Sequence, residues 1–150
     1  MTEFVSDDLI PEASLWNNGR GIHLESWIGM NGNYSLAVGY AYLFWPEFVV
    51  IDDYVLLPGT TQAHLQGWLD KKPSDRRAIE EVLNHRHIVD MHSGEPVTEA
   101  QIRHLGRTLK SIYEHKLGAD FSDRNFVVIF NDEDGLDPVE YQLTFWQEPK

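Results

Sequence analysis

The stretch from residue 98 to residue 146 limits the possible folds most, because it holds one clear helix pattern followed by two clear strand patterns. Thr98 and Gln101 have the spacing of an N-terminal capping box. Apolar residues then recur at helical spacing, namely Ile102, Leu105, Leu109, Ile112, Tyr113 and Leu117. Gly118 follows and suits a helix C-terminus. The pattern predicts one long helix that starts after Thr98 and stops near Gly118.

Two segments rich in β-branched and aromatic residues follow this helix, at 126–130 and 139–146, with a polar turn at 131–138 between them. In the second segment the side chains alternate along the expected strand. One face carries Val139, Tyr141, Leu143 and Phe145, and the other carries Glu140, Gln142, Thr144 and Trp146. Only one face therefore needs to be buried. We predict a β-hairpin with the long helix packed on it.

The rest of the chain predicts shorter elements around this unit. Residues 1–20 suit a loop or a short helix. The expected strands are 21–28, 48–51 and 54–57. The expected helices run from Thr60 or Thr61 through Leu69 to an end near Lys71 and Lys72, and from Ser74 to about Asn84. Two segments stay open between helix and strand: 36–45, where Ser35 would cap a helix, and 85–92.

No internal repeat or linker divides the chain, so residues 1–150 are expected to form a single domain. The elements together predict an α+β fold. An antiparallel sheet that includes the C-terminal β-hairpin would pack against about three to four helices.

Charge and composition exclude several classes of function. The chain has 24 acidic and 12 basic residues, a net charge of -12, which repels nucleic acids and anionic membranes and favours a basic protein partner. It has no cysteine, which removes disulfides, thiol catalysis and thiolate metal sites and suits a reducing compartment. The first residues lack a signal-peptide pattern, and the longest mainly apolar run, 36–51, is too short to span a bilayer. We expect a cytoplasmic protein without a membrane segment or a cofactor.

A group of potential metal ligands lies within eight residues: His85, His87, Asp90 and His92. Imidazole and carboxylate groups bind zinc and other divalent metals. A strand would put His85 and His87 on one face but His92 on the other, whereas a helix would align His85 with His92 but not with His87. No single regular element presents all four, so a metal site is the less favoured interpretation.

Four acids gather in the polar turn expected between the last two strands, Asp132, Glu133, Asp134 and Asp137. Acids at alternate positions before Gly135 resemble part of a calcium-binding loop. In that frame, however, Phe130 and Tyr141 occupy the first and twelfth positions, where the loop requires Asp and Glu. An exposed acidic turn that contacts a partner is the better interpretation.

Asp52 and Asp53 are adjacent acids between two expected strands. Held in a cleft they would suit general acid and base catalysis, but neighbours on a strand point apart, so a solvated turn is favoured. Trp27 and Trp146 lie on the polar faces of their expected strands, where exposed tryptophans mark partner surfaces. Asp52, Asp53 and Trp27 are therefore further candidates for partner binding.

In size and acidity the chain resembles bacterial immunity proteins, which block a toxin by covering its active site. The resemblance implies a small acidic protein-binding module that inhibits a basic toxin or enzyme, and we expect a binding protein more than an enzyme. One alternative is a metal-dependent hydrolase that uses His85, His87, Asp90 and His92. A second alternative is a nucleic-acid mimic, although the acids are interleaved with bases and form no continuous track. The sequence leaves the oligomeric state open.

Overall fold

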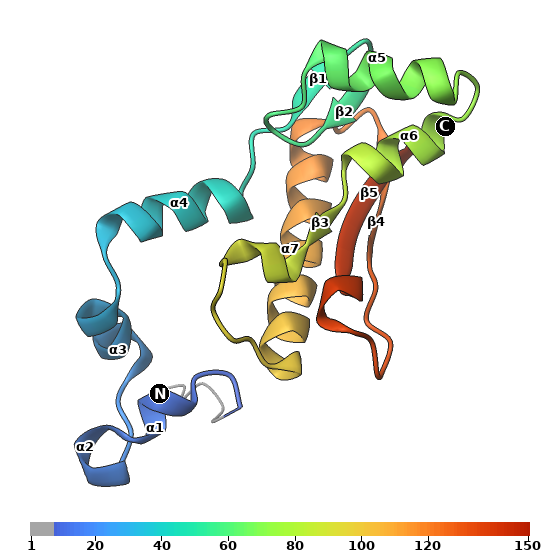
Figure 1. Ribbon diagram of the computed structural model, residues 1–150. Coiled ribbons are helices and arrows are strands. Elements are labelled where there is room, and N and C mark those ends of the chain that lie inside the picture. The colour runs from blue at the N-terminus through green and yellow to red at the C-terminus, as the bar shows by residue number, and fades with distance from the viewer. Residues whose placement is uncertain (1–7) are drawn as a thin grey trace.

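The computed structural model describes residues 8–150, which contain seven α-helices and two small antiparallel sheets (Figure 1). The elements in chain order are α1 (Pro11–Ser14), α2 (Trp16–Gly19), α3 (Leu24–Asn31), α4 (Tyr34–Phe44), β1 (Val49–Ile51), β2 (Tyr54–Leu56), α5 (Gln62–Lys71), α6 (Arg76–Leu83), β3 (Arg86–His87), the 3-10 helix η1 (Ile88–Met91), α7 (Glu99–Asp120), β4 (Asn125–Phe130), the 3-10 helix η2 (Pro138–Glu140) and β5 (Gln142–Glu148). The predicted α+β class, with an antiparallel sheet that includes the C-terminal strand pair, is confirmed.

The long helix α7 starts as its sequence predicts. The Thr98 hydroxyl accepts a hydrogen bond from the Gln101 N–H at 3.1 Å, and the Gln101 side chain accepts one from the Thr98 N–H at 3.0 Å. The helix continues to Asp120, so the predicted stop at Gly118 is wrong by two residues. The Phe121 N–H donates to the Leu117 carbonyl oxygen, which keeps the last turn helical past the glycine.

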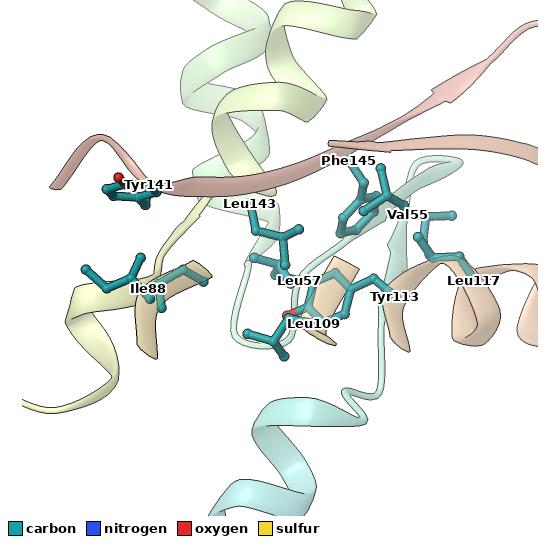
Figure 2. Packing of buried hydrophobic residues seen from close by; sticks show 11 residues of the cluster. Val55, Leu57, Ile88, Leu109, Tyr113, Leu117, Tyr141, Leu143 and Phe145 are labelled. Atoms are coloured by element: carbon teal, nitrogen blue, oxygen red, sulfur yellow. The ribbon is translucent and has the colours of Figure 1, made fainter. Parts of the chain in front are cut away.

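Strand β5 is the middle strand of a sheet in the order β3-β5-β4, with both neighbours antiparallel. The apolar face of α7 packs against this sheet (Figure 2). Leu109, Tyr113 and Leu143 are fully buried there, and the Tyr113 ring contacts the Phe145 ring edge-on at 6.1 Å. Val139 was expected on this buried face but is 58% exposed, because residues 138–140 form the 3-10 turn η2 and not a strand.

The other face of β5 is also covered, which the alternating pattern did not predict. Trp146 is only 5% exposed, and the Arg77 guanidinium of α6 lies over its ring at 4.2 Å. The Glu80 carboxylate accepts a hydrogen bond from the Gln147 N–H at 2.9 Å. Trp146 therefore belongs to the packing between α6 and β5, and its expected role in a free partner surface is wrong.

Asn84, just after α6, joins the two sheets. Its fully buried side chain accepts from the Leu57 N–H at 3.0 Å and donates to the carbonyl oxygens of Val55 at 3.0 Å and Phe145 at 3.2 Å. Leu56, Leu65 and Ile79 form a second buried cluster on this side of the molecule. The small β1-β2 sheet is thereby attached to α6 and to the C-terminal unit.

The short helices α1 and α2 fit the predicted loop or short helix at residues 1–20, of which residues 1–7 lie outside the described part of the chain. The predicted strand at 21–28 is wrong, because residues 24–31 form helix α3. A strand needs a pairing partner, and the part of the chain that the structure describes pairs its strands only within 49–56 and 86–148. Residues 34–44 form a helix, and its cap is Asn33, whose side chain accepts from the Leu36 N–H. Helix α6 is likewise capped by Asp75 in place of Ser74.

Helices α1 to α4 follow one another away from the sheets, and we call residues 8–45 the N-terminal arm (Figure 1). No residue of α3 or α4 is buried. Among residues 8–150 no helix combines the length and the apolar character needed to cross a membrane.

Candidate functional site

Acidic side chains gather where the β4-β5 turn meets the first turns of α7, and we call this region the acidic end. Its acids are Glu99, Asp132, Glu133, Asp134, Asp137 and Glu140, and its bases are Arg103 and Arg107. Six carboxylates against two guanidinium groups leave a net charge of -4 at pH 7. The turn lies at the far end of the β4-β5 pair, beside the start of α7 (Figure 1).

Arg103 holds this acidic end together. Residues 99, 103 and 107 follow one another at single-turn spacing on α7, so their side chains share one face. The Arg103 guanidinium contacts Glu99 at 2.8 Å, Asp132 at 3.5 Å and Asp134 at 2.7 Å, and it donates to the Glu133 carbonyl oxygen at 3.1 Å. Arg107 contacts Asp132 at 2.6 Å. The helix thereby fixes the position of the turn.

The hydrogen bond to Asp134, with further contributions from Tyr141 and Glu99, raises the pKa of Arg103 above its usual range. These ion pairs and hydrogen bonds thus favour the charged form of the guanidinium. The Tyr141 hydroxyl donates to the Glu99 carboxylate at 2.9 Å, and burial raises the pKa of this tyrosine. The network is anchored to the core, because Tyr141 is 1% exposed.

The outward side of the acidic end remains accessible. The Asp134 side chain is 98% exposed although it pairs with Arg103, and Glu133 is also exposed. Asp137 caps η2, where its backbone N–H donates to the Glu140 side chain at 2.7 Å. The four turn acids predicted to contact a partner therefore lie together on an ordered and largely open surface.

Asp52 and Asp53 lie elsewhere, in the tight turn between β1 and β2. Both have positive φ, 49° and 70°, as a two-residue hairpin turn requires. Asp53 pairs with Arg124 at 2.9 Å and Arg76 at 3.5 Å, and Asp52 accepts from the Gln62 amide at 2.6 Å. The two carboxylates thus have separate partners within the fold. Figure 1 places this turn at the opposite extremity from the acidic end.

Trp27 lies on α3 and is half-buried. It belongs to the N-terminal arm, so the structure does not bring it together with the acidic end or with Asp52 and Asp53. The predicted partner-binding residues therefore occupy three separate places.

The four potential metal ligands do not converge. The ring nitrogens Nδ1 of His85 and His87 contact the carbonyl oxygens of Val82 at 2.5 Å and Val139 at 2.7 Å, although the two rings stack edge-on at 5.1 Å. Nε2 of His92 contacts the Tyr40 hydroxyl, and Asp90 is exposed on η1. Within residues 8–150 no three His, Asp or Glu side chains are grouped so that they could hold a metal ion.

The sequence predicts the acidic turn but not the ion pairs that Arg103 and Arg107 make with it. The spacing of Glu99, Arg103 and Arg107 was visible, but the pairing of Arg103 with Asp134 spans 31 residues. Only the packing of α7 on the sheet determines that pairing.

Comparison with known proteins gives no relative: the chain matches no protein-family model, no curated protein and no solved structure.

Proposed function

We propose that the protein is a small binding module that docks a basic protein partner through its acidic end. The observation that carries the proposal is the net charge of -4 at the acidic end, where Arg103 and Arg107 pair with Glu99, Asp132 and Asp134. Asp132, Glu133, Asp134 and Asp137 are the proposed contact residues. Asp52, Asp53 and Trp27 lie outside this surface and become secondary candidates.

Two physical effects support this function. A surface with one sign of charge attracts an oppositely charged partner during diffusion and raises the association rate. Carboxylates that are already ordered lose less side-chain entropy on binding than mobile ones. Each paired acid also retains free lone pairs, because a carboxylate accepts more hydrogen bonds than one arginine donates to it. A lysine or arginine of the partner would complete the network.

The resemblance in size and acidity to bacterial immunity proteins suggests a more specific role. An acidic module that covers the active site of a basic toxin or enzyme would act as a cytoplasmic inhibitor. This role requires no catalytic residue and no cofactor in the chain.

Two triple variants of equal charge test the proposal. The first, Glu133→Gln with Asp134→Asn and Asp137→Asn, removes three negative charges from the acidic end. The second, Asp90→Asn with Glu95→Gln and Asp123→Asn, removes three from exposed positions outside it. Each variant and the parent are immobilised, incubated with lysate at low salt, and the captured proteins are identified and sorted by isoelectric point.

The proposal predicts that the parent and the second variant retain the same basic protein, and that the first variant loses it. Raising the salt from about 0.05 M to about 0.5 M should release it from the parent, since screening shortens the range of the field. Equal capture by both triple variants would show that charges at the acidic end matter no more than charges elsewhere, and the acidic end would then not be the docking site.

A further inference from the structure

The N-terminal arm carries an apolar surface that is separate from the acidic end. From residue 26 to residue 46 the chain has no Asp, Glu, Lys, Arg or His, which makes 21 consecutive uncharged residues in a chain of net charge -12. Helix α4 occupies 11 of them. A helix that is apolar on all sides is normally covered on all sides.

One side of α4 faces the rest of the molecule. Tyr40, Leu43 and Phe44 are half-buried, and Phe44 packs against the main core. The Tyr40 ring lies edge-on to the His92 ring at 5.7 Å. At the end of the helix, the Lys116 ammonium group lies over the Trp45 ring at 5.4 Å. These contacts fix the helix orientation on the folded body.

The opposite side of α4 is open. Tyr34, Val38 and Tyr42 recur at intervals of four residues, so they form one stripe along the helix, which we call the outer stripe. They are 92%, 56% and 68% exposed. Ile28 and Met30 of α3 add further exposed apolar surface to the same arm, at 51% and 61%.

The charge of the molecule decides which partner fits this stripe. A basic protein gains nothing there, because residues 26–46 offer no carboxylate. An anionic membrane is repelled by the net charge, and the segment has no Lys or Arg to contact lipid headgroups. The complementary surface is another uncharged apolar helix face, and a second copy of this chain supplies one.

Two copies of this acidic chain can also meet at α4 with little electrostatic repulsion. Two molecules of net charge -12 repel each other wherever acidic surfaces approach. Helix α4 lies apart from the sheets and from the acidic end (Figure 1), and the outer stripe is exposed, so two stripes can meet while the acidic ends stay apart. Beyond the Debye length of about 8 Å at physiological salt, the remaining repulsion is screened.

We propose that α4 is a self-association surface, at which the outer stripe of one copy packs against the outer stripe of a second copy. A two-fold axis across the two helices buries the same residues twice, as in most homodimers. The acidic ends remain exposed in this dimer, so it presents two copies of the acidic surface. The inference does not depend on the proposed function.

Molar mass measured by light scattering after size exclusion, from about 1 µM to about 100 µM, tests the proposal. The parent should have twice its chain mass of 17.3 kDa at the upper concentrations. Val38→Asp should raise the dissociation constant at least about tenfold, because it buries an unpaired charge at the interface. Val139→Asp is the matched control: it adds the same charge at a valine of η2 that is 58% exposed and lies outside the outer stripe, and it should leave the dimer intact.

A second measurement covers the case in which Val38→Asp fails to fold. The chain has no cysteine, so Val38→Cys introduces a single thiol. It should crosslink two copies under mild oxidation, and Val139→Cys should not. A parent that is monomeric over the whole range, or a Val38→Asp dimer as tight as the parent dimer, would overturn the proposal. A monomeric parent that floats with phosphatidylcholine vesicles would overturn it in favour of a membrane surface.

Discussion

Glu80 shows how a single residue links the fold to pH. Its side chain lies between α6 and β5 with no solvent exposure, where it accepts from the Gln147 N–H and contacts Arg76. Burial raises the pKa of the Glu80 carboxyl above its ordinary value of 4.5, more than these partners lower it. The folded protein therefore holds this proton more tightly than the unfolded chain.

The sign of the pH effect follows directly. For an acid whose pKa is raised by folding, the stabilising contribution is fully present below the ordinary pKa and is lost as pH rises through the raised value. The free energy of unfolding of the parent relative to Glu80→Gln should therefore be larger at about pH 4 than at about pH 7. Urea melts of both proteins at each pH measure this difference. A parent that gains relative stability toward neutral pH would show that the partners outweigh the burial.

Substitution of Leu143 tests the contribution of a single residue to the core. It is fully buried between α7 and the sheet, so Leu143→Ala should lower the free energy of unfolding by about 2 to 5 kcal/mol. Leu109→Ala, on the facing side of α7, should cost a similar amount. Leu15→Ala is the control, because Leu15 is 75% exposed, and it should change stability by no more than about 0.5 kcal/mol. Equal denaturation midpoints for Leu143→Ala and Leu15→Ala would mean that the strand is peripheral.

At the scale of elements, α7 is the part whose structure its own sequence specifies. The Thr98 capping box is local, so Thr98→Ala should lower stability by about 1 kcal/mol. Thr108→Ala replaces an exposed threonine within the same helix and should be neutral or slightly stabilising, since alanine is the better helix former. Thermal melts should show a lower melting temperature for Thr98→Ala than for Thr108→Ala. A lower melting temperature for Thr108→Ala would contradict the role of the capping box.

The elements also show where sequence patterns stop being informative. The helix α7, the β4-β5 pair and the turn acids follow from local spacing and could be predicted. The helix α3 could not, because four alternating residues suit a strand only if a partner strand is near. The burial of Trp146 depends on α6 crossing the sheet, and the pairing of Arg107 with Asp132 spans 25 residues. Both arise from tertiary packing, which no periodicity within β5 or α7 specifies.

At the scale of the whole molecule, the structure separates three tasks. The C-terminal unit supplies the main core, residues 26–46 present an uncharged surface, and the acidic end presents charge at a different place (Figure 1). We therefore expect substitutions in the acidic end to change binding with little effect on stability, whereas core substitutions change stability first.

The most direct test of the proposed docking surface is hydrogen–deuterium exchange of the protein alone and bound to the basic protein that it captures. Binding at the acidic end predicts slower exchange of backbone amides in residues 131–141 and in the first turns of α7, with residues 49–56 unchanged. Slower exchange confined to the β1-β2 turn, or to α4 at constant protein concentration, would contradict the assignment of the acidic end as the docking surface.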